Sequence, residues 1–266
     1  SIHDLDSFYT LVDLNRAGTP LVEIVSEPDM RSGDEAYAYL TEIRRLVRHL
    51  EICDGNMEEG SLRCDANVSV MLKGATQFGV KVEVKNMNSI RNVKRAIDYE
   101  VIRQIDAIES GETLVQETRS FDASKGTTFS MRSKEAAHDY RYFPEPDLPP
   151  FAVSDEMIEG IKQDMPALPK ALMHKYIEQL QLSVYDAEIL TSEKAIALFF
   201  EEIIQLTKNY KAAANWVSGP IKSWLNENAK AINELSITPK HIADIIQLID
   251  ESKLNFTIAS QQLFPA

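Results

Sequence analysis

The chain has 266 residues, 44% of them hydrophobic and 26% charged, a balance typical of a folded protein and not of a disordered one. Its formal net charge of −13 argues against a nucleic-acid binder that works through a broad basic surface. No apolar run approaches the roughly 20 residues that cross a bilayer. The two cysteines, Cys53 and Cys64, are too few for a disulfide framework. We therefore expect a soluble cytoplasmic protein.

Residue usage changes near residue 150. All twelve arginines lie at or before Arg141, and the proline-rich segment 143–150 cannot continue a helix. We therefore expect two domains, 1–149 and 150–266. Because the first residue is Ser1 and not Met, and the sequence opens like a strand, we also expect the chain to be part of a longer or processed protein.

The first region alternates predicted helices and strands. A helix is expected over 33–50, then a strand over 62–72 that forms a hairpin with residues 80–85. A second helix is expected over 89–110, and its apolar side is formed by Ile90, Val93, Ile97, Val101, Ile105 and Ile108. Another hairpin over 114–133 turns at 124–126. These elements predict an α+β domain on an antiparallel sheet.

The second region, 150–266, reads as helical throughout. Prolines punctuate it at Pro166, Pro169 and Pro239, and we expect the Gly219–Pro220 pair to end a helix as well. Short helices of this kind predict an all-α bundle, in which Trp216 and Trp224 are packing residues.

The most informative stretch is 55–72. Adjacent carboxylates at Glu58 and Glu59 lie on a glycine-flanked turn that leads into the first strand. One face of that strand carries Arg63, Asp65, Asn67 and Ser69. These groups on a rigid sheet are suited to a metal-bound phosphate, although the solvated face of an antiparallel strand has the same periodicity.

The segment 85–89 connects a strand to the second helix, and Asn88 or Ser89 is the expected N-cap of that helix. The free backbone N–H groups at a helix N-terminus favour the binding of a phosphate. The basic residues of that helix form either an RNA-facing patch or a solvated face; they are Arg91, Lys94, Arg95 and Arg103. No Walker A, GxGxxG, protein-kinase or HExxH motif is present, and His49 ends a helix, where a dipole contact is the simpler role.

Several long blocks together resemble the B subunit of the glutamyl/aspartyl-tRNA amidotransferase. They are collinear over nearly the whole chain, at 12–29, 57–67, 85–89, 116–119, 139–147, 185–187, 190–191, 199–201 and 214–216. The resemblance implies a cytoplasmic ligase of protein biosynthesis that amidates Glu or Asp misacylated on tRNA-Gln or tRNA-Asn. It implies ATP and Mg²⁺ as cofactors, phosphorylation of the side-chain carboxylate, and ammonia supplied by a separate amidase subunit, with a small third subunit that makes the complex a heterotrimer.

The resemblance also suggests roles for particular residues. The catalytic candidates are Glu58, Glu59, Arg63 and Asp65, and the candidate metal ligands are Glu58, Glu59 and Glu83. The candidates for nucleotide or substrate binding are Asn67, Lys85, Asn86, Asn88 and Arg141. Arg63 and Lys85 would contact phosphate or carboxylate, and Glu58 and Glu59 serve either a metal or the ammonia path.

Two alternatives stand beside this interpretation. One is a non-catalytic adaptor that presents tRNA to an amidase through the basic helix, and the other is a Mg²⁺-dependent phosphotransferase acting on a small molecule. The family's N-terminal half-cradle, which supplies part of its metal site, has no counterpart here, and the family's tail continues beyond Ala266. We therefore expect this piece alone to be inactive.

Overall fold

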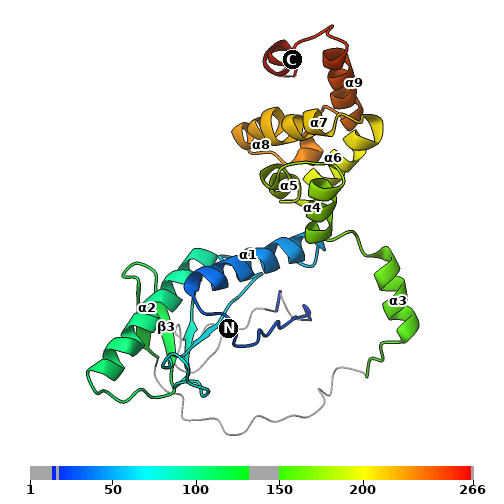
Figure 1. The fold of residues 1–266 in the computed structure, drawn as a ribbon. Coiled ribbons are helices and arrows are strands. Elements are labelled where there is room, and N and C mark those ends of the chain that lie inside the picture. Colours follow the sequence, from blue (N-terminus) through cyan, green and yellow to red (C-terminus); the bar gives the residue numbers. More distant parts are fainter. Residues whose placement is uncertain (1–13, 16–17, 132–149, 265–266) are drawn as a thin grey trace. The chain divides into compact units, whose positions relative to one another are not determined.

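The computed structural model describes residues 14–15, 18–131 and 150–264 (Figure 1). The chain divides into two compact units, Ser1–Arg31 and Ser32–Ala266. The described part of the first unit contains neither helix nor strand. The strand-like start expected from the sequence falls on residues 1–13, which lie outside the described residues. Most of the proline-rich segment on which the boundary at 149/150 was based lies outside the described residues, so that boundary stays a prediction.

Helix α1 spans Gly33–His49 and confirms the helix predicted over 33–50. Ser32 caps its N-terminus by accepting a hydrogen bond from Glu35 N at 3.2 Å. Acidic residues in the first turn and Arg48 and His49 in the last turn complement the helix dipole. Its apolar stripe is buried in the core of this part of the chain.

Four short strands form one sheet in the order β1-β2-β3-β4. They span Ala66–Val68 (β1), Val82–Lys85 (β2), Thr118–Asp122 (β3) and Thr127–Ser130 (β4). The pairs β1·β2 and β3·β4 are antiparallel hairpins, as predicted, whereas β2 and β3 run parallel, so the sheet is mixed and not antiparallel as expected. The predicted α+β class, followed by a helical region, is confirmed. The physical reason is helix α2, which connects β2 to β3 and returns the chain to the end where β2 began. Strand β1 is shorter than the predicted 62–72, because its pairing with β2 extends over three residues, Ala66–Val68.

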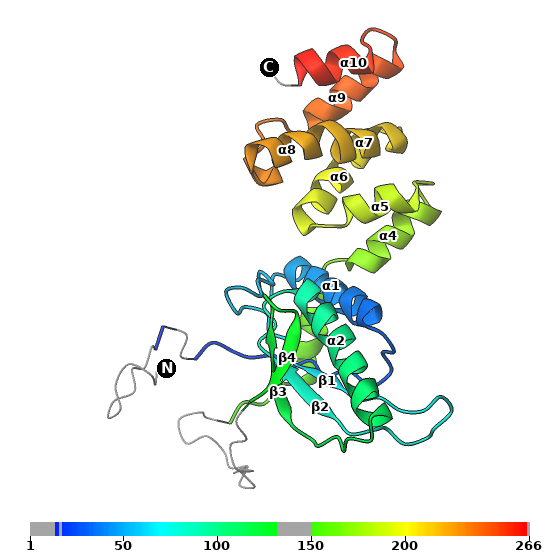
Figure 2. The same ribbon diagram turned by 90° about the vertical axis from the view of Figure 1, so that its left-hand side faces the viewer.

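Helix α2, Ile90–Glu109, lies across one face of the sheet, and α1 packs against α2 (Figure 2). Its buried stripe differs from the predicted one. The buried residues are Val93, Ala96, Glu100, Gln104 and Ala107, whereas Ile105 and Ile108 are 41% and 52% exposed. In the second half of the helix the stripe that faces the sheet therefore lies one residue earlier than predicted, and the polar Glu100 and Gln104 are buried where Val101 and Ile105 were expected.

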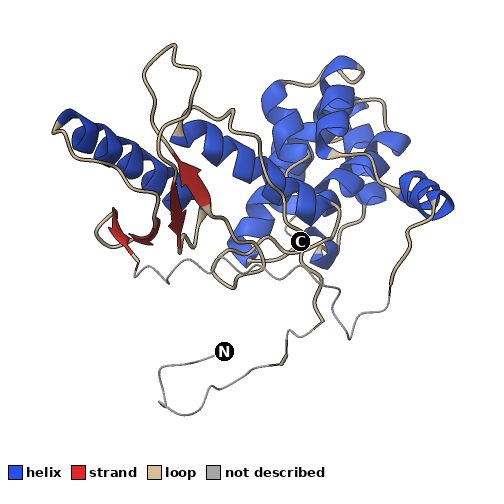
Figure 3. Cartoon of the chain, turned by 90° about the horizontal axis from the view of Figure 1, so that it is seen from below, coloured by secondary structure: helices blue, strands red, loops and turns tan. Residues whose placement is uncertain are grey.

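From residue 150 onward the described chain contains helices and loops alone, which confirms the predicted helical region (Figure 3). The α-helices are α3 (Asp155–Asp164), α4 (Pro169–Glu178), α5 (Val184–Leu190), α6 (Lys194–Leu206), α7 (Tyr210–Trp216), α8 (Lys222–Asn228), α9 (Pro239–Asp250) and α10 (Phe256–Ile258). Short π-helical segments at Val217–Ile221 and Ala259–Leu263 and a 3₁₀ turn at Ile232–Glu234 complete them. None of the helices in the described ranges is long and apolar enough to span a bilayer.

The Gly219–Pro220 pair does not end a helix, in contrast to the prediction. The π-helical segment Val217–Ile221 joins α7 to α8 without interruption. A wider π turn shifts the hydrogen-bonding pattern where proline lacks its N–H, which allows the helix to continue. Pro169 and Pro239, by contrast, occupy first-turn positions of α4 and α9, where proline is favoured.

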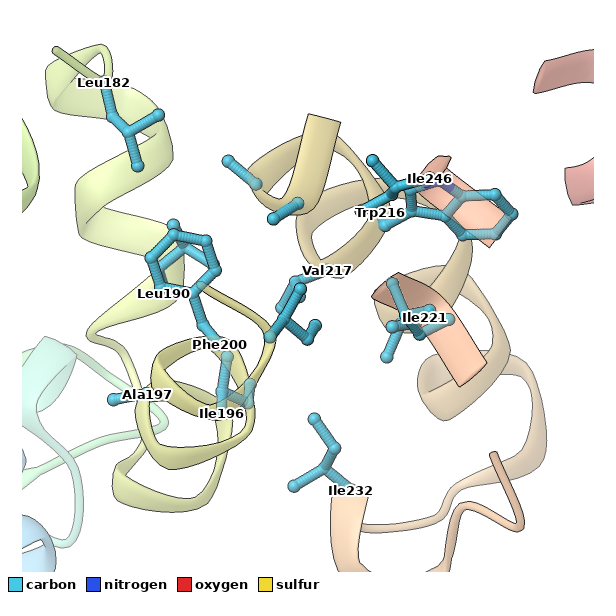
Figure 4. Close-up of a cluster of buried hydrophobic side chains, with 14 of the residues drawn as sticks. Leu182, Leu190, Ile196, Ala197, Phe200, Trp216, Val217, Ile221, Ile232 and Ile246 are labelled. Carbon is cyan, nitrogen blue, oxygen red and sulfur yellow. The ribbon is translucent and has the colours of Figure 1, made fainter. Parts of the chain in front are cut away.

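Apolar side chains from several of these helices form one core (Figure 4). Phe200 and Trp216 are fully buried in it, together with Leu190, Ile221 and Ile246. Phe200 also makes an edge-on contact with Tyr176, with ring centroids 5.0 Å apart. The packing role predicted for Trp216 is therefore confirmed.

Candidate active site

The face of the sheet opposite α2 carries a row of polar side chains, here called the polar sheet face. It comprises Asp65, Asn67, Glu83, Lys85, Thr118 and Ser120. The strand register places Asn67 beside Glu83 and Glu83 beside Thr118, while Lys85 lies beside Ser120. The structure thus brings four of the predicted site residues together: Asp65, Asn67, Glu83 and Lys85.

Lys85 is the centre of the charges on this face. Its Nζ lies 3.0 Å from Asp65 Oδ2 and 3.3 Å from Glu83 Oε1. The hydrogen bond to Asp65, with a further contribution from Glu83, raises the pKa of Lys85 despite the opposing effect of burial. A permanently charged ammonium is therefore held between two carboxylates that are both accessible to solvent.

The other carboxylate oxygen of Glu83 is held from the neighbouring strand. Thr118 Oγ1 donates to Glu83 Oε2 at 2.9 Å, so that Glu83 is fixed by contacts with both Lys85 and Thr118. Thr118 and Ser120 were not among the predicted site residues. The parallel pairing that brings β3 beside β2 has no signature in the local sequence, although the block 116–119 was part of the resemblance.

Asn86 ends β2 in the left-handed conformation, with φ of 64°, which asparagine tolerates better than most residues. Its Nδ2 donates to Ser120 Oγ at 2.9 Å, which ties the residue to β3. The side chain of Asn88 instead accepts a hydrogen bond from Asn92 Nδ2 at 2.7 Å. Ser89 is the N-cap of α2, since its Oγ accepts from Asn92 N at 3.2 Å, and this decides between the two predicted caps.

Glu58 and Glu59 lie on an exposed turn with a well-defined backbone. Asn56 Oδ1 accepts hydrogen bonds from the N–H groups of Glu58 and Glu59, at 3.0 and 3.4 Å. Arg44 Nε on α1 donates to Gly55 O at 3.0 Å and anchors the turn. In the described part of the chain, no hydrogen bond or ion pair joins the two carboxylates to the polar sheet face, and the same holds for Arg63. Their roles remain predictions.

A magnesium ion usually binds one or two carboxylates together with substrate phosphates. Asp65 and Glu83 fit this requirement, since both are partly exposed carboxylates on a rigid sheet. The described residues do not provide a complete set of protein ligands for a metal ion, because no group of three or more His, Cys, Asp or Glu residues suited to a metal occurs among them. The predicted ligands Glu58, Glu59 and Glu83 therefore do not form such a group by themselves.

Most basic residues of α2 make contacts within the chain. Lys94 pairs with Asp34 and Asp98, Arg95 bonds to Asn92 and to a backbone carbonyl of the β3–β4 turn, and Arg103 bonds to Glu100; the distances range from 2.5 to 3.2 Å. This arrangement disfavours the RNA-facing patch considered above. Arg141 and His138 lie outside the described residues. His49 is buried, and its Nε2 lies 2.9 Å from Ala167 O, so that a structural role is sufficient for it.

The sequence profile of the GatB/GatE catalytic domain matches residues 1–159, and that of the GatB domain matches residues 198–265. The second match lies within the helical region.

Individual relatives give the same result. The chain is 52% identical over 261 residues to the B subunit of the aspartyl/glutamyl-tRNA(Asn/Gln) amidotransferase of Thermodesulfovibrio yellowstonii, which covers 98% of this chain and 55% of the relative. It is 53% identical over 250 residues to the protein of the same name from Trichlorobacter lovleyi, covering 94% of this chain and 53% of the relative. For the Acaryochloris marina protein the identity is 49% over 257 residues, covering 97% and 52%. The chain therefore spans about half the length of the curated relatives it matches.

Proposed function

Since the chain belongs to the GatB/GatE amidotransferase family, we propose that it forms part of an enzyme that amidates glutamate or aspartate misattached to tRNA-Gln or tRNA-Asn. The observation that carries the proposal is Lys85 held between Asp65 and Glu83 on the polar sheet face. A fixed cation flanked by carboxylates is suited to phosphoryl transfer, in which positioning and charge neutralisation provide most of the catalysis.

The proposed chemistry has two steps. An oxygen of the side-chain carboxylate attacks the γ-phosphorus of ATP, so that an acyl phosphate forms and ADP leaves. Ammonia then attacks the acyl carbon and phosphate leaves with the transferred oxygen, which gives the amide. The first step is needed because a carboxylate is a poor acceptor for ammonia until one of its oxygens becomes part of a leaving group.

Four residues of the polar sheet face and two asparagines that follow β2 have a place in this scheme. Lys85 would contact the transferred phosphate or the substrate carboxylate, while Asp65 and Glu83 would hold Mg²⁺, which would neutralise phosphate charge. The amides of Asn67, Asn86 and Asn88 position the nucleotide or the aminoacyl end. The remaining predicted residues in the described part of the chain, Glu58, Glu59 and Arg63, make no hydrogen bond or ion pair with this face, and Arg141 lies outside the described residues.

The proposed assembly is a cytoplasmic heterotrimer in which an amidase subunit releases ammonia and a small subunit joins the other two. We propose that the rest of the full-length protein completes the metal site, so that this piece alone does not turn over ATP. The adaptor alternative is less well supported, because it requires a free basic surface on α2, and Lys94, Arg95 and Arg103 are engaged within the chain.

The test is ATP hydrolysis by the full-length protein in the heterotrimer with the amidase and small subunits, with and without misacylated tRNA. Wild type should hydrolyse ATP only with the charged tRNA, and Lys85→Met should lower that rate about a hundredfold because it removes the fixed cation. Lys81→Met, on the same segment but outside the ion-paired group, is the matched control and should keep the wild-type rate. Turnover without tRNA would favour the small-molecule phosphotransferase, and an unchanged Lys85→Met rate would place the chemistry elsewhere.

A further inference from the structure

Glu100 is a fully buried carboxylate in the middle of α2, on the face that packs against the sheet. A buried charge is costly unless it is paired and hydrogen-bonded. Both carboxylate oxygens of Glu100 accept hydrogen bonds. Arg103 Nε lies 3.1 and 3.0 Å from the two oxygens, Gln104 Nε2 donates to Oε1 at 3.0 Å, and Thr128 Oγ1 donates to Oε2 at 2.9 Å. The Glu100 carboxylate is thus held in place by hydrogen bonds from three side chains.

The contacts of Glu100 continue to β3 through Arg119. Arg119 Nε donates to Thr128 Oγ1 at 2.9 Å and lies 3.7 Å from Glu100 Oε2. The Arg119 guanidinium also donates to Thr128 O at 3.0 Å and to Glu117 Oε1 at 2.6 Å. The two carboxylates and two guanidinium groups balance in charge, which makes this partly buried network tolerable.

The resulting set, here called the Glu100 network, comprises Glu100, Arg103, Gln104, Glu117, Arg119 and Thr128. It connects α2 to three strands, since Gln104 Nε2 also donates to Val68 O on β1 at 3.1 Å. The network therefore fixes the distance and register of the helix relative to β1, β3 and β4 through polar contacts with specific geometry.

Strand β3 carries this constraint to the other face of the sheet. Side chains alternate along a strand, so Arg119 points toward α2 while Thr118 and Ser120 lie on the polar sheet face. Thr118 Oγ1 donates to Glu83 at 2.9 Å, and Ser120 Oγ accepts from Asn86 Nδ2 at 2.9 Å. The two residues that hold Glu83 and Asn86 in place are thus the immediate neighbours of Arg119, which Glu100 contacts at 3.7 Å and through the Thr128 hydroxyl.

We infer that Glu100 is a positioning residue for the polar sheet face, acting through Arg119 and β3 to hold Thr118 against Glu83. The inference rests on the proposed function, because it assigns a task to Glu83 in amidation. Stability alone does not require a buried ion pair, since apolar residues of similar volume often pack equally well. The carboxylate supplies what an apolar residue lacks, a directional set of hydrogen bonds that specifies one position of β3.

The first part of the test uses the full-length protein in the heterotrimer and measures the amidation of misacylated tRNA. Thr118→Val removes the hydroxyl that holds Glu83 and keeps the side-chain shape; kcat should fall about tenfold with KM for tRNA unchanged, the size expected for a lost hydrogen bond to a charged group. Thr118→Ser restores the donor and should restore kcat. Thr127→Val, the same substitution on β4 at a hydroxyl with no contact in the described part of the chain, should leave kcat at the wild-type value.

The second part asks whether Glu100 acts through Thr118. Glu100→Gln should reproduce the loss of kcat, and combining it with Thr118→Val should cause no further loss, because both changes release the same contact. Independent losses that multiply in the double variant would overturn the inference. A Glu100→Gln protein with a lower Tm but a wild-type kcat would also overturn it, since that result describes a purely structural role.

A variant that does not fold, and a failure of the proposed function, can each be distinguished from a failure of this inference. If Glu100→Gln does not fold, Thr128→Val takes its place, because it breaks the link between Arg119 and Glu100 at one hydroxyl, and the same loss of kcat is expected. A wild-type complex that does not amidate misacylated tRNA would refute the proposed function and this inference together. An active wild type with unaffected variants would refute the inference alone.

Discussion

Thr118 donates a hydrogen bond from its hydroxyl to Glu83 Oε2 at 2.9 Å, across the parallel pair of strands β2 and β3. The contact joins residues on either side of helix α2 in the sequence. It holds one oxygen of Glu83, while the other lies 3.3 Å from the ammonium of Lys85. The orientation of this carboxylate is therefore set by the pairing of β2 with β3 and not by its own strand alone.

The left-handed backbone at Asn86 separates the role of its main chain from that of its side chain. Asn86→Gly keeps the conformation, whereas Asn86→Ala adds strain of about 1 kcal/mol. We expect urea unfolding to show the alanine variant less stable than the glycine variant by about this amount. Both variants lack the amide and should amidate tRNA equally slowly, and a glycine variant with full activity would remove Asn86 from the site.

The helical core should be sensitive at Phe200, which is fully buried and contacts Tyr176 edge-on. Phe200→Ala should lower the free energy of unfolding by about 3–5 kcal/mol, because it removes apolar contacts and leaves a cavity. Leu198→Ala on the same helix is the control, since Leu198 is 53% exposed; its effect should stay within about 0.5 kcal/mol. Circular dichroism during urea unfolding measures both, and equal effects would contradict the packing described.

Asp186 predicts a pH dependence of stability. Burial alone would raise the pKa of its carboxyl, but hydrogen bonds from Lys211 and Ser183 outweigh burial and lower it. A lowered pKa in the folded state means that the contribution is complete above the unfolded pKa of about 3.9 and is lost as pH falls from there toward the folded value. The stability difference between wild type and Asp186→Asn should therefore be constant from pH 7 to 5 and shrink below pH 4. A difference that grows on acidification would contradict this sign.

Cys64 should react slowly with thiol reagents. Burial, with a smaller effect of the neighbouring Asp65 charge, raises the pKa of its thiol to about 11. The thiolate is the reactive species, so Cys64 in a Cys53→Ser protein should react at pH 8 at least about tenfold more slowly than a free cysteine. The release of thionitrobenzoate measures this rate. A reaction as fast as that of free cysteine would contradict the raised pKa.

The sequence was sufficient for features set by local periodicity. The bounds of α1 and α2 follow from apolar spacing, with Ser89 as one of the two expected caps of α2, and both hairpins follow from glycine-containing turns. Alternation along β1 and β2 also placed Asn67 and Glu83 on one face correctly, because the period of a strand is independent of its partners.

Features that depend on distant partners were not accessible in this way. The parallel pairing of β2 with β3 is decided by where α2 packs, so Thr118 was missed as a member of the site. The buried stripe of α2 was misplaced because Glu100 and Gln104 are polar, and their burial is explained by Arg119 and Thr128, which lie far along the chain. Pattern rules that assign polar residues to the solvent have no means of anticipating such a network.

The central claim is that a side-chain carboxylate is phosphorylated before it is amidated. The most direct measurement uses the full-length complex with tRNA misacylated by glutamate that carries ¹⁸O in its side-chain carboxylate, and analyses the released phosphate by mass spectrometry. Phosphorylation of the carboxylate predicts one ¹⁸O in the phosphate for each amide formed, because the transferred oxygen leaves with the phosphate. Phosphate without ¹⁸O, at a normal rate of amidation, would contradict it.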